Sequence, residues 1–202
     1  MPHEIAFGVL LASTSGAAII AHTLALVPLA YAVPFVVLPS VALLLSVMLL
    51  RQRQYLGLHL FADRLLIGAI WGLLATLGYD AIRPLLKLAF GFTFDPYRAM
   101  PVFGSLMTGL PTTDPLAITV GWIYHFWNGL SFGMMFALVR PRGGPIAGMT
   151  WGLGLEGFML AIYPSLLKAR LDDPGFLAMG LVGHVLWGAV LGEGLRKGGC
   201  HA

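Results

Sequence analysis

The sequence predicts an all-α polytopic membrane protein with six transmembrane helices, four of which form a direct two-helix repeat. The 202 residues are 58% hydrophobic and 10% charged, whereas about 25% charged residues are typical of a soluble domain. Six apolar stretches each approach the roughly 20 residues that a helix needs to cross a bilayer. A short motif also occurs twice at the same internal spacing. Together these observations indicate that lipid surrounds most of the chain.

The six predicted helices follow the apolar stretches and leave only one long connection. They cover about 5–25, 29–50, 65–86, 116–139, 145–167 and 175–195. The first stretch lacks the basic start of a secretory signal and is therefore expected to be retained. Pro34 and Pro39 predict a kink in the second helix, because proline lacks a backbone N–H and clashes with the preceding turn.

The chain is expected to divide into an N-terminal part, residues 1–62, and a four-helix membrane core, residues 63–202. The first part is a transmembrane hairpin with a cytoplasmic turn. The core carries an outer loop at 87–115 that is rich in aromatic residues and proline. Such a loop is expected to be compact, or to contain an interfacial helix, and to cover the outer mouth of the bundle.

The basic residues predict the orientation of the helices in the membrane. If all six segments span, one side of the membrane holds Arg51, Arg53, Arg64, Arg140, Arg142, Arg196 and Lys197. The other side holds Lys87, Arg98, Lys168 and Arg170 together with several aspartates. The positive-inside rule then predicts a multi-pass protein of the cell inner (plasma) membrane with both termini in the cytoplasm. The net charge is only +3 and no basic face is evident, which excludes nucleic acid as a partner.

The internal repeat locates a candidate site. Gly68-x-x-Trp71-Gly72-Leu73, followed by Ala81-Ile82-Arg83-Pro84, returns as Gly148-x-x-Trp151-Gly152-Leu153, followed by Ala161-Ile162-Tyr163-Pro164. The next apolar segment in each copy carries His-x-x-x-Gly-x-x-x-Gly, which begins at His125 in the first copy and at His184 in the second. Two equivalent helix pairs about a pseudo-twofold axis would bring the two histidines to similar depth on facing helices.

Ionisable residues within the spans are the candidates for function, because a charged side chain is costly in hydrocarbon and faces the bundle interior or a watery cavity. Asp80, His125, Glu156 and His184 are predicted to line one cavity between the midplane and the outer face. Helical spacing places further side chains near them. The full candidate site comprises Glu156, His125, His184, Asp80, Asn128, Arg83, Tyr163 and Trp187.

Several chemistries suit this group of residues. A buried carboxylate with two imidazoles can pass protons. Glu156, His125 and His184 would also suit a transition metal, and two facing histidines could clamp a haem. The alternative is purely structural, because the glycine pattern is chiefly a helix-packing motif and Asp80 can be neutralised by Arg83 three residues later. Glu156 has no basic residue within one turn and is therefore the strongest functional candidate.

The C-terminal two-thirds of the chain, residues 66–196, resemble the YagU-type (DUF1440-like) inner-membrane proteins, a family of unknown biochemical function. The resemblance is carried by Tyr124-His125-x-x-x-Gly129-x-x-Phe132-Gly133, Arg140-Pro141-Arg142-Gly143-Gly144, Ile146-Ala147-Gly148 and Gly183-His184-x-x-Trp187. It implies a membrane protein, and the family's link to survival in acid implies a proton-handling site. This chain differs by the hairpin at residues 1–62 and by Glu156, where a neutral polar residue or histidine is expected.

The favoured interpretation is proton-coupled transport or proton and ion handling, with Glu156 as the titrating group and His125 and His184 as relay or ligands. Asp80 and Arg83 would gate the outer mouth beneath the 87–115 loop. An accessory or anchoring subunit of a larger membrane complex is the alternative, and a haem- or metal-binding electron carrier is a third. The expected partners are the lipid bilayer and either further copies of the chain or a larger membrane complex. Phosphate-loop, nucleophile-elbow and zinc-protease motifs are absent from the sequence, so an enzyme is not favoured.

Overall fold

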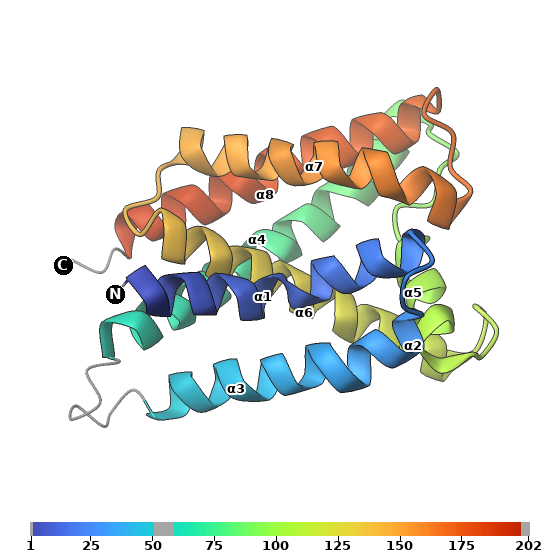
Figure 1. Cartoon of the computed structure of the whole chain (residues 1–202). Helices are drawn as coiled ribbons and strands as arrows, with labels where there is room; N and C mark the ends of the chain where they lie inside the picture. The colour runs from blue at the N-terminus through green and yellow to red at the C-terminus, as the bar shows by residue number, and fades with distance from the viewer. Residues whose placement is uncertain (1, 51–58, 199–202) are drawn as a thin grey trace.

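The computed structural model describes residues 2–50 and 59–198, and this part of the chain is helical without strands (Figure 1). The predicted all-α fold is confirmed. The elements are α1 (Pro2–Thr23), α2 (Leu29–Ala32), the π-helical turn η1 (Val33–Val37), α3 (Leu38–Leu49), α4 (His59–Phe90), α5 (Ala99–Thr108), α6 (Pro115–Val139), α7 (Pro145–Leu167) and α8 (Pro174–Lys197). Arg51 and Arg53, used above for orientation, lie outside the described residues.

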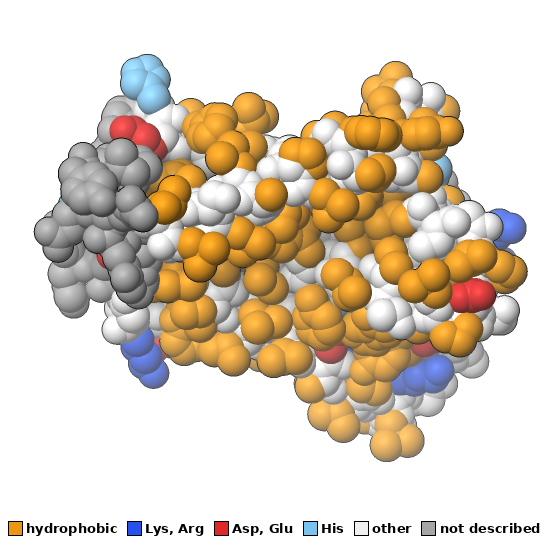
Figure 2. All heavy atoms as spheres, turned by 90° about the horizontal axis from the view of Figure 1, so that it is seen from below, with side chains coloured by type: hydrophobic (Ala, Val, Ile, Leu, Met, Phe, Trp, Pro, Cys, Tyr) orange, Lys and Arg blue, Asp and Glu red, His pale blue; other side chains and the backbone are white. Residues whose placement is uncertain are grey.

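Five segments are long and apolar enough to cross a membrane: His3–Thr23, Leu29–Leu49, α4, α7 and α8. Figure 2 shows the corresponding surface, where hydrophobic side chains cover most of one face and charged groups lie mainly near its ends. The sixth predicted span, α6, has 25 residues but is not among these five segments. The count of six therefore stays a prediction.

The second apolar segment contains a π-helical turn at the first of its two prolines. Pro34 lies in the π-helical turn Val33–Val37, and Pro39 lies in the first turn of α3. Proline cannot donate the regular helical hydrogen bond, and a π-helical turn is one way in which a helix accommodates the lost bond. Residues 29–49 thus form one span with an interrupted first half.

Helix α4 is the centre of the bundle. It packs against both α6 and α8, while α7 packs on α8 and α1 packs on α6. Helix α3 lies against α1 and α4, so the N-terminal hairpin is joined to the rest of the bundle by an apolar core that includes Leu44, Leu65 and Met134. The two ends of the chain, labelled N and C, lie at the same end of the bundle in Figure 1.

Asp-Pro pairs start the two helices that carry the candidate histidines. Asp114 precedes α6 and accepts a hydrogen bond from the Leu116 N–H at 2.8 Å. Asp173 precedes α8 and accepts from the Gly175 N–H at 2.8 Å. Aspartate satisfies free N–H groups of the first turn, and proline fits the first helical position because its missing N–H is not needed there. Both helices therefore start at a defined residue, which fixes the depth of their histidines.

Glycines bring the helices of each pair into backbone contact. A Cβ atom on Gly68 would lie 2.7 Å from the Gly133 carbonyl oxygen, and one on Gly72 would lie 2.5 Å from that of Gly129. In the second pair, a Cβ atom on Gly148 would collide with the Gly188 carbonyl. Small residues give helices in lipid their close contact, so both Gly-x-x-Trp-Gly segments serve as packing surfaces.

Candidate functional site

A cavity of about 90 Å³ lies between α4, α6, α7, α8 and the segment 94–103. This volume exceeds the 10–15 Å³ or so that one water molecule requires, so the cavity has room for several waters or a small polar group. Seven of the eight predicted site residues line it, namely Arg83, His125, Asn128, Glu156, Tyr163, His184 and Trp187. The eighth, Asp80, contacts two of the seven, so the structure brings the whole predicted set together.

Glu156 and His184 form a buried pair within this cavity. The Glu156 Oε2 atom lies 2.8 Å from His184 Nδ1, and each residue is 5% exposed. The same Nδ1 atom lies 2.9 Å from the Gly180 carbonyl oxygen. A carbonyl oxygen only accepts hydrogen bonds, so Nδ1 must carry a proton, which it shares with the carbonyl and the carboxylate.

Gly180 makes space for the glutamate. A Cβ atom at this position would lie 3.0 Å from Glu156 Cδ and nearer still to Oε1. Gly180 also stands one helical turn before His184, so its carbonyl points along α8 toward the imidazole. One glycine thereby provides both room for the carboxyl group and the acceptor that orients the histidine.

A second acid–imidazole pair joins α4 to α6. His125 Nε2 is 3.1 Å from Asp80 Oδ1 and 3.0 Å from Oδ2. The Arg83 guanidinium also donates to Asp80 Oδ1. Asp80 and Arg83 are both buried, and their charges neutralise each other, as the spacing of three residues predicted. His125 adds a hydrogen bond to a pair that is already neutral.

The segment before α5 is attached directly to this second pair. Arg83 donates from Nη1 to the Pro96 carbonyl oxygen, and the Tyr97 hydroxyl donates to the Asp80 carbonyl oxygen at 3.0 Å. Pro84 explains why that carbonyl is available, because a proline four residues after Asp80 cannot provide the helical N–H partner. The predicted outer loop contains α5, which packs against α6. Its start is therefore anchored to Asp80 and Arg83.

Tyr79 connects the two pairs and was not predicted from the sequence. Its ring centroid lies 6.2 Å from that of His125 and 4.9 Å from that of His184, while the Arg83 guanidinium sits 4.1 Å from the ring centroid. Gly183 leaves room for the ring, since a Cβ atom there would lie 2.6 Å from it. The histidines were expected on directly facing helices. They instead reach the cavity from α6 and α8, which both pack against α4, and a tyrosine of α4 contacts both.

Three further predicted residues complete the lining. Asn128 is 8% exposed, and its Oδ1 atom has no hydrogen-bond partner within the described part of the chain. Trp187 donates from Nε1 to Thr76 Oγ1 at 3.0 Å, which ties α8 to α4. The Tyr163 ring packs edge-on against Phe103 at 5.5 Å between centroids. Asn128 is thus a buried polar group with unused hydrogen-bonding capacity at the cavity.

The geometry does not favour the metal and haem interpretations. Among residues 2–50 and 59–198, no group of three or more His, Cys, Asp or Glu side chains lies close enough to hold a metal ion. The Tyr79 ring contacts both His125 and His184, and each imidazole already uses one nitrogen on a carboxylate. A haem between the two imidazoles would occupy the place of the Tyr79 ring, so this ring would have to move out of the cavity.

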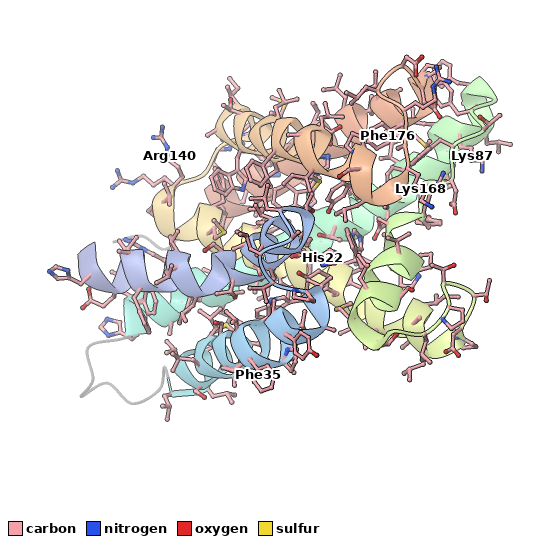
Figure 3. The ribbon with its side chains drawn as sticks, turned by 45° about the vertical axis from the view of Figure 1, so that its right-hand side comes forward. His22, Phe35, Lys87, Arg140, Lys168 and Phe176 are labelled. Carbon is pink, nitrogen blue, oxygen red and sulfur yellow. The ribbon has the colours of Figure 1, made fainter. Side chains whose placement is uncertain are left out.

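Outside the cavity, polar and charged groups have ordinary structural roles. His22 accepts from the Leu29 N–H at 3.3 Å and so closes the turn between α1 and α2. Figure 3 shows Lys87 and Lys168 toward one end of the bundle and Arg140 toward the other. These basic side chains thus lie at the ends of the bundle, whereas the ionisable groups of the cavity lie in its middle.

No family model matches the chain, and neither a curated protein nor a solved structure is similar to it. The resemblance to the YagU-type proteins therefore stays a prediction.

Proposed function

We propose that the chain is a proton-coupled membrane transporter in which the Glu156–His184 pair binds and releases the proton. The observation that carries the proposal is this buried contact of 2.8 Å in a cavity with room for water. A carboxylate next to an imidazole can hold a proton on either group, and histidine changes its charge near neutral pH. Buried ionisable groups within membrane spans are typical of proton relays.

The distribution of charge favours Glu156–His184 over Asp80–His125 as the proton-binding pair. Arg83 already balances the charge of Asp80. Glu156 has His184 as its ion-pair partner. Among the described residues, Arg83 is the one lysine or arginine that lines the cavity, and it is already bound to Asp80. When Glu156 is ionised and His184 is neutral, the pair carries one negative charge without a counter-charge in a low-dielectric site. Such a pair tends to hold one proton or another cation.

We further propose α6 as the sixth span. With 25 residues at ~1.5 Å per residue it is long enough to cross the bilayer. Helix α4 ends and α7 begins at opposite ends of the bundle (Figure 1), so the chain between them must cross, and α6 is the long helix in that interval. Six spans also put both termini on one side of an inner membrane, which the positive-inside rule assigns to the cytoplasm.

We include the internal repeat in the proposal. In the second copy the glycine contact and the acid are both shifted by the same helical turn, and this agreement supports the repeat. In the first pair Gly72 meets the Gly129 carbonyl, which lies four residues after His125. In the second pair Gly152 meets the carbonyl of His184 itself, so α7 is displaced by one turn along α8. The acid moves by the same turn, because Asp80 follows Gly72 by eight residues and Glu156 follows Gly152 by four. Each carboxylate thereby reaches the histidine of its own pair.

Access from the outer side would be controlled by the anchored segment at Pro96 and Tyr97. Release of the Arg83 contact to Pro96 would allow this segment to move away from the cavity. Asp80 and Arg83 then act as a gate, and Tyr79, which contacts both imidazoles and Arg83, would transmit the change.

Proton uptake into liposomes tests the proposal. We expect wild-type protein to acidify the lumen of vesicles that contain a pH-sensitive dye when an outside-acid gradient is imposed. Glu156→Gln keeps the size and hydrogen bonding of the side chain but removes its charge, and should abolish this uptake. Glu193→Gln is the matched control, because Glu193 pairs with Arg196 and Lys197 near the end of α8 and does not line the cavity. Equal uptake by all three proteins would contradict the proposal.

One observation favours a second candidate, an accessory subunit of a larger membrane complex. The most apolar window of α7 is 17% buried, the smallest share among the five spans, and α7 packs mainly on α8. A partner could use this face. Co-purification of the same protein with wild type and Glu156→Gln, without proton uptake by either, would favour this role.

A further inference from the structure

A long apolar groove lies beside the polar cavity. It encloses about 1050 Å³ between α1 and α7, with α6 and the 140–145 turn completing its walls. The two flanking helices make few contacts with each other. The groove is lined mainly by apolar side chains, among them Ile20, Met135, Phe136, Ile146 and Phe158. Its volume and apolar lining suit an alkyl chain.

The groove and the cavity are neighbours that share a wall. Four residues line both spaces, namely Phe132, Leu155, Met159 and Tyr163. These are flexible or rotatable apolar side chains rather than backbone, and methionine adapts its shape readily. A molecule in the groove can therefore place its end in the cavity after a change of side-chain rotamers.

The cavity offers groups that recognise a cation. It holds the Glu156 carboxylate and the unpartnered Asn128 Oδ1 atom, both hydrogen-bond acceptors. Its walls include the rings of Tyr79, Phe103 and Trp187, and aromatic faces attract cations. Arg83, the basic residue of the lining, is held by Asp80 and the Pro96 carbonyl. A cationic head beside Glu156 would be complementary in charge.

We propose that the groove and cavity together bind a lipophilic amine dissolved in the membrane, with its alkyl chain between α1 and α7 and its protonated amine beside Glu156. This inference rests on the proposed function and names its substrate class. The amine cation and the proton of the Glu156–His184 pair satisfy the same negative charge. Binding of one favours release of the other, which is the requirement for exchange of an amine for a proton.

An ordinary phospholipid is the competing occupant. Arg140 lies at the inner end of the groove, where it can contact a lipid phosphate while an acyl chain fills the groove. A phospholipid in this position leaves the Glu156 end without a cation. The two occupants therefore differ in whether Glu156 matters for binding.

Radiolabelled dodecylamine is the probe, and the full chain in nanodiscs is the receptor. We expect saturable binding above that of empty nanodiscs. Dodecanol, which has the same chain but no charge, should compete at least about 30-fold less well, as should phosphatidylglycerol, because an unpaired buried charge is costly. Glu156→Gln should weaken dodecylamine binding by a similar factor.

Two glycine variants test the groove. Gly154 lines it and has open space at its Cβ position, so Gly154→Trp fills the groove without disturbing helix packing. We expect about tenfold weaker binding or more, since several methylene groups lose their site. Gly157→Trp is the control, because Gly157 lies on the same helix with the same open space but lines neither the groove nor the cavity. It should bind like wild type.

Equal competition by dodecanol, or unchanged binding by Gly154→Trp or Glu156→Gln, would overturn the inference. Competition by phosphatidylglycerol as strong as by dodecylamine would assign the groove to ordinary lipid. Proton uptake by the wild-type protein is measured separately, with and without a dodecylamine gradient. Proton uptake with no amine binding would refute the substrate class alone, whereas amine binding with no proton uptake under either condition would refute the proposed function.

Discussion

Gly180→Ala is the most informative single change, because it acts on the candidate site without removing any polar group. The added methyl group would lie 3.0 Å from Glu156 Cδ and closer to Oε1, so the carboxyl group must move away. We expect the 2.8 Å contact with His184 Nδ1 to be lost. A hydrogen bond to a charged group contributes about 1.5–3 kcal/mol, whereas Gly to Ala within a helix gains about 1 kcal/mol. The expected net loss is about 0.5–2 kcal/mol.

A double-mutant cycle in mixed micelles measures this effect. The free energy of unfolding is determined for wild type, Gly180→Ala, Glu156→Ala and the double variant. With Glu156 truncated there is no carboxyl group to displace, and Gly180→Ala should become stabilising by about 1 kcal/mol. Gly157→Ala is the control for helix propensity, because its Cβ position is open. Equal destabilisation by Gly180→Ala in both backgrounds would refute the reasoning.

Three further predictions concern the helix packing and the outer gate. Gly72→Leu would place a side chain against a backbone carbonyl of α6 and should prevent assembly, seen as aggregation in size-exclusion chromatography; a monodisperse variant would contradict the packing. Tyr97→Phe removes the donor to the Asp80 carbonyl and should cost about 1 kcal/mol. Hydrogen exchange should then be faster in segment 91–98, and unchanged exchange would argue against the anchor. Asp80→Asn leaves Arg83 buried without its counter-charge and should cost about 3–5 kcal/mol, whereas Asp172→Asn, at an exposed ion pair, should leave the stability unchanged.

The helices were predictable because hydrophobic stretches in lipid have few alternatives to a helix. The predicted segment 145–167 coincides with α7, and 116–139 differs from α6 by one residue. Helix α4 runs beyond 65–86 at both ends, to His59 and Phe90. The extensions, residues 59–64 and 87–90, contain polar or aromatic residues, so hydropathy alone gives no signal for them.

The members of the site were also predictable, but their pairing was not. The free-energy cost of placing a charged side chain in hydrocarbon indicated Glu156 and both histidines from the sequence. The structure places all three around one cavity. Which acid meets which imidazole depends on the one-turn displacement of α7 along α8, set by backbone contacts such as Gly152 with His184. A repeat at constant spacing contains no information about that displacement. The acid that contacts each histidine could therefore be assigned only from the structure.

Tyr79 was missed because an aromatic residue in an apolar span is ordinarily a packing residue. A signal existed in its spacing of four residues from Arg83, which places the two on one helical face. Gly180 was missed for a similar reason, since it falls outside the His-x-x-x-Gly pattern. Its position one turn before His184 is the feature that identifies it.

Nitrogen NMR of histidine-labelled protein in lipid tests whether Glu156 and His184 share a proton. The His184 signals are identified by their loss in His184→Gln. We expect a protonated Nδ1 whose resonance changes in Glu156→Gln and stays the same in Glu193→Gln. An unprotonated Nδ1 in the wild type, or identical resonances in all three proteins, would contradict it.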